Sequence, residues 1–284
     1  MSYKNTASAA PTLLKITSLR PFEGHPYKVQ DNAEMDALVE SIRVNGILAP
    51  LIVRPVENGG EYEVVSGHRR LHAARKAGLT ELPVLIRALD RDSAAIAVVD
   101  SNLHREHILP SEKAFAYKLK MEALSHRGIT CGQVGHKSRD DISDTDSGRQ
   151  VQRYIRLTCL IPELLEKMDK GEIALSVGVE LSYLDESSQR EILEQCVIND
   201  CTPSYSQAWR MHKAGREGLL TKDVIQFLMS EEKANQRETV KVPASRLREV
   251  LPKGLDAGKT EDFIIKACEY YRKYLIRQRS RDER

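Results

Sequence analysis

Residues 61–79 read EYEVVSGHRRLHAARKAGL, and they decide the fold because a strand pattern passes directly into a helix pattern. Residues 61–66 are rich in β-branched and aromatic side chains, which is typical of strands. The residues after Gly67 favour a helix, and Gly78 stands where a glycine commonly closes one. The stretch therefore predicts a strand followed at once by a helix over about residues 69–77.

The sequence on both sides of this stretch predicts a compact mixed α/β domain. Apolar side chains recur at i, i+3, i+4 and i+7 across residues 32–45, the spacing of an amphipathic helix that Gly46 closes. The tripeptide Asn58-Gly59-Gly60 has the composition of a hairpin turn. Short apolar runs predict three further strands, at residues 13–21, 50–56 and 82–87.

After about residue 92 the strand signal disappears and helices are predicted. We expect them at residues 93–106, 110–126, 149–159, 162–170 and 187–199, after Pro203, and at 260–279. Residues 231–242 are polar and read as a linker. The fold class is therefore α+β, a small α/β domain followed by an all-α part. We divide the chain into five parts. Residues 1–11 are a disordered tail, residues 12–108 an α/β domain and residues 109–200 a helix-turn-helix domain. Residues 201–259 are a helical region with a linker, and residues 260–284 are a C-terminal helix.

The composition excludes several classes of protein. The 284 residues are 41% hydrophobic and 30% charged, which rules out a collagen-like chain, and no apolar run approaches the length of a membrane span. Five scattered cysteines without a CxxC pair indicate free thiols in a reducing cytoplasm. The first residues lack the apolar segment of a secretory signal, so we expect a cytoplasmic protein without a membrane. The net charge of +2 is too small to indicate nucleic-acid binding, so the distribution of charge must decide.

The junction at residues 67–70 is the strongest candidate for phosphate binding. A helix N-terminus presents unpaired N–H groups and a partial positive charge. Gly67 lets a ligand approach the backbone, and Arg69 and Arg70 add charged donors. The alternative is an ordinary helix with solvated arginines on its first turn.

A second polar cluster follows at residues 100–105, DSNLHR. Asn102 and Arg105 are three residues apart, so in a helix they share a face and could hold a phosphate or a metal-bound oxygen. A solvated polar helix face is the alternative interpretation.

A third cluster, at residues 141–160, predicts a helix-turn-helix with its tight turn at Asp146-Ser147-Gly148. Val151, Ile155 and Leu160 can face the core. Arginine pairs well with guanine and glutamine with adenine, as a recognition helix requires. The residues that we expect to face DNA are Arg149, Gln150, Gln152, Arg153 and Arg156. A plain helical hairpin with a basic face is the alternative.

The order of these three clusters resembles the ParB-type partition proteins, the family of centromere-binding segregation factors. Residues 67–74, GHRRLHAA, stand in place of the family's GERRxRAA box, and residues 46–55 resemble the strand that lines its nucleotide pocket. Residues 101–105 match the ENxQR-like box in part, and residues 109–114 look like its continuation. Leu160-Ile161-Pro162-Glu163 closes the helix-turn-helix as the family's L-P-E segment does. The resemblance covers about residues 12–195.

The resemblance implies a sulfiredoxin-like N-terminal domain and a DNA-segregation function. Members bind a palindromic centromere-like site, bind CTP with Mg2+, and slide along DNA as a clamp to segregate a plasmid, mobile element or chromosome. The implied partners are double-stranded DNA, a ParA-type ATPase and a second copy of the chain, and the implied location is the nucleoid. By position, the nucleotide-binding residues would be Gly67, His68, Arg69, Arg70, Asn102 and Arg105, with Asn102 also at the metal.

Two departures from the family pattern bear on catalysis. His68 and Ser101 stand where the family has glutamates beside the phosphates and the metal. Mg2+ prefers hard oxygen ligands, so we expect CTP to be bound but hydrolysed slowly or not at all. The alternatives are a helix-turn-helix transcriptional regulator, a nucleoid-occlusion relative without turnover, a small-molecule kinase, or a sulfiredoxin-like reductase. The reductase is disfavoured because the first cysteine is Cys131.

The C-terminal helix predicts self-association. Ile264, Cys268, Tyr271 and Leu275 form an apolar stripe at the 4-3-4 spacing of a short coiled coil. The residues from 272 to the end carry a net charge of +4 and could touch DNA non-specifically. The alternative is a terminal helix packed on its own domain.

Overall fold

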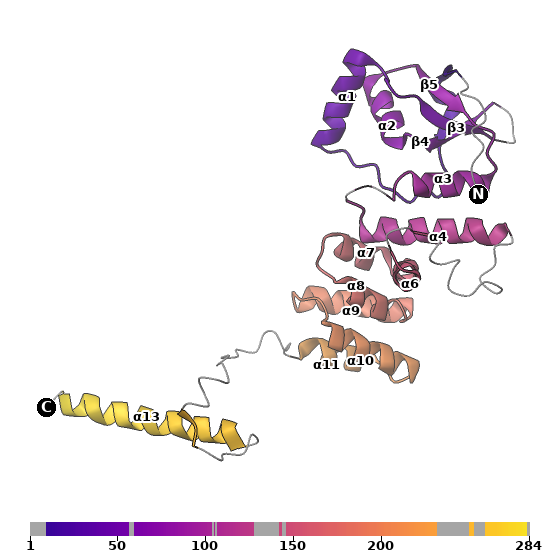
Figure 1. The fold of residues 1–284 in the computed structure, drawn as a ribbon. Helices are drawn as coiled ribbons and strands as arrows, with labels where there is room; N and C mark the ends of the chain where they lie inside the picture. Colours follow the sequence, from indigo (N-terminus) through magenta and orange to yellow (C-terminus); the bar gives the residue numbers. More distant parts are fainter. Residues whose placement is uncertain are drawn as a thin grey trace. The chain divides into compact units, whose positions relative to one another are not determined.

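The computed structural model describes residues 10–56, 60–103, 105, 107–127, 142–143, 146–231, 250–252 and 259–282. The chain divides into two compact units, Met1–Glu231 and Glu232–Arg284. The first unit contains the mixed α/β part and a set of stacked helices, and the second contains one long helix (Figure 1). The predicted α+β class is confirmed. Most of the predicted linker and the tail up to residue 9 lie outside the described residues.

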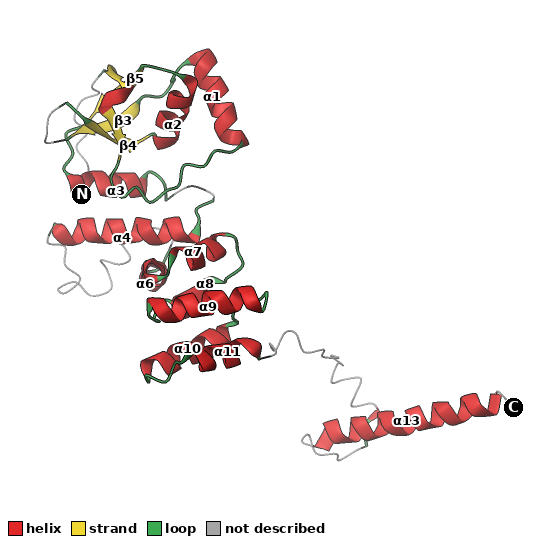
Figure 2. Cartoon of the chain, turned by 180° about the vertical axis from the view of Figure 1, so that it is seen from behind, coloured by secondary structure: helices red, strands yellow, loops and turns green. Residues whose placement is uncertain are grey.

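The sheet of the first unit is mixed and has five strands. They are β1 (Thr12–Lys15), β2 (Leu19–Pro21), β3 (Leu51–Pro55), β4 (Tyr62–Ser66) and β5 (Glu81–Ile86), in the order β1-β5-β3-β4-β2. Figure 2 shows these strands gathered at one end of the first unit. β3 pairs antiparallel with β4 and parallel with β5.

The single strand predicted over residues 13–21 is wrong, because the chain forms two strands there. A 3-10 turn at Ile16–Ser18 separates them. β1 pairs with β5 and β2 pairs with β4, at opposite edges of the sheet. The chain must therefore turn between them and cannot continue as one strand.

Two helices pack together beside the sheet. α1 (Ala33–Asn45) begins at its cap Asn32, whose side chain accepts a hydrogen bond from the Met35 N–H at 3.0 Å. α2 (His68–Ala77) follows β4 directly, as predicted. Met35, Val39 and Ile42 of α1 are buried against Ala73 of α2. This packing holds the N-terminus of α2 at the end of β4.

Two further helices connect the sheet to the helical region. α3 (Arg91–Asp100) packs against β4 and against α4 (Pro110–His126), and α4 has the predicted bounds. The helix predicted to reach residue 106 is wrong, since α3 ends at Asp100. The side chains of Ser101 and Asn102 both donate hydrogen bonds to the Val98 carbonyl. If the helix continued, this carbonyl would instead accept a hydrogen bond from a backbone N–H of the next turn. Asn102 and Arg105 therefore do not share a helix face.

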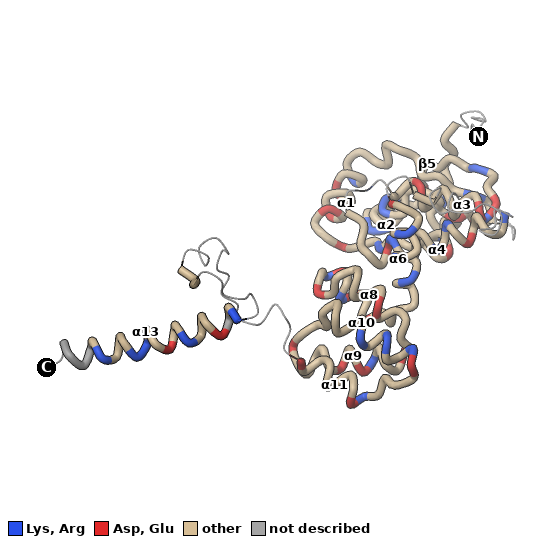
Figure 3. The backbone as a smooth tube through the Cα atoms, turned by 60° about the horizontal axis from the view of Figure 1, so that its bottom comes forward, with Lys and Arg blue, Asp and Glu red and all other residues tan. Residues whose placement is uncertain are grey.

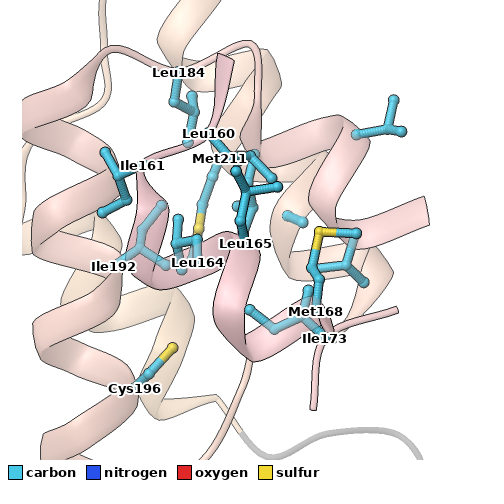
Figure 4. Close-up of a cluster of buried hydrophobic side chains, with 14 of the residues drawn as sticks. Leu160, Ile161, Leu164, Leu165, Met168, Ile173, Leu184, Ile192, Cys196 and Met211 are labelled. Carbon is cyan, nitrogen blue, oxygen red and sulfur yellow. The ribbon is translucent and has the colours of Figure 1, made fainter. Parts of the chain in front are cut away.

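The helical region is a stack of short helices around a second core. It contains α6 (Gly148–Arg156), a 3-10 turn at Leu157–Cys159, α7 (Pro162–Asp169), α8 (Leu175–Leu181), α9 (Glu186–Ile198), α10 (Tyr205–Arg216) and α11 (Lys222–Ser230). Figure 4 shows the aliphatic side chains and Met168 and Met211 that fill the core between them. This core joins the helices from α7 to α11, and Tyr154 of α6 packs against it.

The second unit contains α13 (Thr260–Asp282), which covers the predicted C-terminal helix. Cys268, Tyr271 and Leu275 of the predicted stripe are exposed on it. Across the part of the chain that the structure describes, no helix is both long and apolar enough to cross a bilayer.

Candidate functional site

The predicted phosphate-binding residues of the α/β domain line one pocket. The cavity has a volume of about 160 Å³ and is partly open to solvent. Gly67, His68, Arg69, Arg70, Asn102 and Arg105 all line it, so the structure brings the first two clusters together. Ser101, which the resemblance placed beside the phosphates, also lines the pocket. The lining residues that the sequence did not predict are His25, Tyr27, Lys28, Val29 and Ser66.

The floor of the pocket is the junction between β4 and α2. Gly67 has φ 108°, a conformation that favours glycine, and a Cβ there would lie 2.9 Å from Leu51 Cγ. α2 has no side-chain cap and no acidic residue in its first turn. Its first N–H groups therefore remain available to an anion.

Arg70 and Arg69 flank this junction in different ways. The Arg70 guanidinium donates to the backbone carbonyls of Ala49 and Pro50, the second at 3.1 Å, and so braces the entry to β3. The Arg69 side chain is 40% exposed, and its Nη2 lies 3.0 Å from Glu34 Oε2. Arg70 thus stabilises the backbone at the start of β3. Arg69 pairs with the exposed Glu34, and a bound anion could take the place of that carboxylate.

His68 forms one wall of the pocket as a neutral ring. Its Nε2 accepts a hydrogen bond from the Phe22 N–H at 3.3 Å. Burial lowers the pKa of His68 to about 3, helped by the neighbouring His25 and Arg105. A neutral imidazole whose Nε2 already accepts a hydrogen bond is a poor ligand for Mg2+.

The segment after α3 also lines the pocket. Asn102 is 7% exposed, and its Nδ2 donates to the Val98 carbonyl at 2.7 Å and to Ser101 Oγ at 3.2 Å. The Arg105 guanidinium lies 5.6 Å from the centre of the Tyr27 ring. The two residues therefore meet at the pocket through the turn that ends α3.

The loop at residues 25–29 closes the pocket, and contacts from the helical region hold it. The Lys28 backbone N–H donates to Glu112 Oε1 at 2.8 Å, and Lys28 Nζ lies 3.1 Å from Asp169 Oδ2. Asp169 also accepts hydrogen bonds from the N–H and the Oγ of Ser111, at 3.0 and 2.6 Å. Because these partners are distant in sequence, no local sequence pattern predicts that this loop is part of the site.

The charge of the pocket suits an anion. Lys28, Arg69, Arg70 and Arg105 line it, and no Asp or Glu is among its described lining residues. No cluster of three metal-ligating side chains of the His, Cys, Asp and Glu types occurs in the described residues. The side-chain amide oxygen of Asn102 is a hard ligand that fits Mg2+, provided that phosphate oxygens and water supply the other ligands of the ion.

The third cluster forms the N-terminal part of the helical region. The Ser147 hydroxyl caps α6, accepting from the Gln150 N–H at 3.4 Å, so Gly148 is the first residue of the helix and not part of the turn. Residues 141, 144 and 145 lie outside the described residues, so the helix predicted before the turn is not tested. Tyr117 Oη of α4 donates to Asp146 at 2.5 Å and so anchors the approach to α6.

The predicted DNA-facing side chains of α6 differ in their surroundings. Arg149 is exposed, and Arg153 Nη1 donates to Gln150 Oε1 at 3.4 Å. Gln152 instead turns to α4, with its Nε2 3.7 Å from Met121 Sδ. Arg149, Gln150 and Arg153 thus lie together, and Gln152 lies apart from them.

Arg156 is held by the protein itself. Its Nη2 donates to the Ser182 carbonyl at 2.9 Å, and its guanidinium lies 4.2 Å from the Tyr183 ring centre. Its buried Nε has no hydrogen-bond partner among the described residues. Arg156 therefore links the end of α6 to the end of α8.

The chain is similar to known proteins over much of its length. Residues 2–103 match the family model of the ParB N-terminal domain. The probable chromosome 1-partitioning protein ParB of Deinococcus radiodurans is 32% identical over 206 residues, which cover 72% of this chain and 67% of the relative. The chain spans about two thirds of the length of the curated relatives that it matches.

Two solved structures of C-terminally truncated ParB from Caulobacter crescentus are also similar. The complex with the centromeric parS site is 22% identical, with a TM-score of 0.42, covering 71% of this chain and 98% of that chain. The complex with CTP-γ-S is 25% identical, with a TM-score of 0.32, covering 66% of this chain and 99% of that chain.

Proposed function

The chain belongs to the ParB family of chromosome-partitioning proteins, and from this membership we propose that it binds a DNA site and a nucleotide to segregate a replicon. The replicon is a plasmid, a mobile element or a chromosome. The DNA site is palindromic and centromere-like, because two copies of the chain present two equal recognition helices. The protein acts on DNA in the cytoplasm, at the nucleoid.

One observation carries the nucleotide part of this proposal. Two sequence clusters more than 30 residues apart meet in one pocket that has four cationic side chains and no carboxylate among its described lining residues. The uncapped N-terminus of α2 faces this pocket across Gly67. A triphosphate requires this combination of positive potential and free N–H groups.

The resemblance to ParB-type proteins specifies CTP with Mg2+ as the ligand. Gly67, Arg69, Arg70 and Arg105 would hold the phosphates, and the side-chain amide oxygen of Asn102 would be the protein's ligand to the metal. Mg2+ would neutralise phosphate charge. His68 lines the wall as a neutral ring and supplies neither charge nor a metal ligand. The protein therefore acts as a CTP-dependent sliding clamp in which turnover is slow.

The DNA part rests on α6. Arg149, Gln150 and Arg153 are neighbours near its N-terminus, where recognition helices contact base edges. The exposed apolar stripe of α13 would join two copies of the chain. The ParA-type ATPase is the remaining partner that the family resemblance implies.

Selection from a random pool of duplexes tests this function. The chain should enrich a palindromic sequence, and calorimetry should show CTP binding that ATP does not match. CTP should also change the residence of the chain on closed circular DNA that carries the selected sequence. Enrichment without any CTP binding would favour the transcriptional regulator. Failure to enrich a sequence would reject the proposal.

A further inference from the structure

The surface of α10 carries an exposed ridge that the proposed function leaves unused. We define the α10 ridge as Tyr205, Trp209, Lys213 and Arg216. Tyr205 is 52% exposed and Trp209, the chain's single tryptophan, is 48% exposed. Lys213 Nζ lies 5.9 Å from the Trp209 ring centre, and Arg216 is exposed. The twelve residues of α10 contain no Asp or Glu, and the first acidic residue after them is Glu217.

The four ridge residues project on one side of the helix. Gln207, Ala208 and Met211 are buried and define the side of α10 that faces the core. At about 100° per residue, the four ridge positions fall within a sector of about 80° that lies outside this buried side. Arg210 projects elsewhere and pairs with Glu231 of the segment after α11.

The ridge is continuous with the basic face of α6. Arg149, Arg153 and Arg156 share one face of α6, because they are spaced by four and three residues. Arg156 lies over the Tyr183 ring, and Tyr183 stacks on His212 of α10 with centroids 4.3 Å apart and planes at 2°. His212 borders the ridge on the helix, and its Nδ1 lies 2.7 Å from Glu180 Oε2. Figure 3 marks the Lys and Arg positions along α6 and α10.

We infer that the α10 ridge contacts the sugar–phosphate backbone of duplex DNA beside the segment that α6 holds. This inference rests on the proposed function and extends its DNA contact to a second helix. Lys213 and Arg216 supply charge for phosphates. The Trp209 indole N–H and the Tyr205 hydroxyl are donors of the kind that phosphate oxygens accept.

DNA suits this ridge better than an acidic protein does. The ridge has two cations and two aromatic side chains that carry donors, and it adjoins a helix already assigned to DNA. The surface formed by α9 and α11 has a different character, with Glu186, Glu191, Glu194 and Asp223. A duplex that lies along α6 would therefore meet positive charge in the direction of Tyr183 and α10.

Trp209 provides a direct test because it is the chain's single tryptophan. The full chain is titrated with the selected duplex carrying long flanks, and binding is followed independently by the anisotropy of labelled DNA. Quenching of Trp209 fluorescence by acrylamide should fall when the long duplex is bound, since DNA covers the indole. A short duplex restricted to the selected sequence should protect it less. Binding seen by anisotropy without protection of Trp209 would overturn the inference and leave the proposed function intact.

A charge variant gives the second measurement. Lys213→Ala with Arg216→Ala should make the dependence of log K on log salt shallower by about two for the long duplex. The matched control, Arg190→Ala with Lys222→Ala, removes two exposed cations from α9 and α11 and should leave the slope unchanged. An unchanged slope in the Lys213/Arg216 variant overturns the inference. Protection of Trp209 by poly-glutamate equal to that by the duplex assigns the ridge to acidic peptides and also overturns it. Absence of any duplex binding rejects the proposed function itself.

Discussion

The imidazole ring of His68 packs against that of His25, with centroids 3.6 Å apart and planes inclined by 36°. Burial lowers the pKa of both rings, and that of His68 falls to about 3. His25 Nδ1 lies 2.8 Å from the Tyr27 carbonyl, and His68 Nε2 accepts from the Phe22 N–H. Two neutral rings thus join the loop at residues 25–29 to the start of α2.

The buried His68 ring predicts a pH dependence of stability. The pKa of His68 lies near 6.5 in the unfolded chain and about 3 in the folded protein, so the unfolded state binds the extra proton between these values. The free energy of unfolding should therefore fall as the pH drops below 6.5, by at most about 1.4 kcal/mol per pH unit from this group. Urea unfolding of the wild type and of His68→Gln at pH 7 and pH 5 measures it. Equal pH dependence in the two proteins would contradict the prediction.

Arg69 and Glu34 give a matched pair of variants for nucleotide binding. Arg69→Ala should weaken CTP binding because it removes a pocket cation, whereas Glu34→Ala should preserve or strengthen it because it releases that cation. The two side chains are 40% and 74% exposed, and an ion pair so open to solvent contributes about 1 kcal/mol or less to stability, so both variants should fold. Calorimetry with CTP and Mg2+ measures the two affinities. Equal effects of the two substitutions would exclude Arg69 from the pocket's function.

Turnover of CTP should be slow or absent. Neither His68 nor Ser101 offers the charged oxygen that commonly positions metal and water in phosphoryl transfer. Phosphate release is measured under conditions in which calorimetry shows that CTP is bound. Arg70→Ala should abolish CTP binding, so any phosphate release by this variant measures contaminating hydrolase activity. Arg70 also donates hydrogen bonds to the Ala49 and Pro50 carbonyls, so circular dichroism must show that the variant is folded. Rapid phosphate release that Arg70→Ala removes would show that the prediction is mistaken.

Arg149 should read a base. Arg149→Ala is expected to cost about 1–3 kcal/mol on the selected duplex and much less on unrelated duplexes, so that specificity relaxes. Gln150→Ala should relax the preference at a neighbouring position. Binding is measured on a panel of duplexes with single base-pair changes, with Arg190→Ala as the control. If the base preferences of Arg149→Ala and Gln150→Ala match those of the wild type, α6 is not the recognition helix.

Truncation after Lys259 should convert a dimer into a monomer. It removes α13, on which Tyr271 and Leu275 are 61% and 42% exposed and could pack against a second copy of the helix. Light scattering of the full and truncated chains measures the change. A truncated chain that remains dimeric would assign self-association to another part of the molecule.

The sequence was sufficient where signals were local. The Pro110-Ser111-Glu112 start of α4 and the Gly46 end of α1 were predicted because caps and stops lie within a few residues of the element they limit. The convergence of Gly67 with Asn102 followed from the family resemblance, and the pocket contains both.

Features that depend on distant residues were missed. α8 is short and contains Gly178, whose missing side chain makes room for Met168, so its sequence gives little helical signal. The predicted end of α3, at residue 106, lies beyond its actual end. The helix stops earlier because the Asn102 side chain donates to the Val98 carbonyl, and the spacing of apolar residues does not reveal such a hydrogen bond. The sequence did not predict that residues 25–29 line the pocket, because the residues that contact this loop, Glu112 and Asp169, are distant in sequence.

The contacts of Lys28 bear on how the molecule can be dissected. This residue lines the pocket, but Glu112 and Asp169, which hold it, lie beyond the domain boundary drawn at residue 108. A fragment cut at that boundary would keep every lining residue, including Lys28, and would lose both contacts that Lys28 makes with the helices beyond it. The pocket is therefore shared by the two parts of the first unit, and an isolated N-terminal fragment is not its functional equivalent.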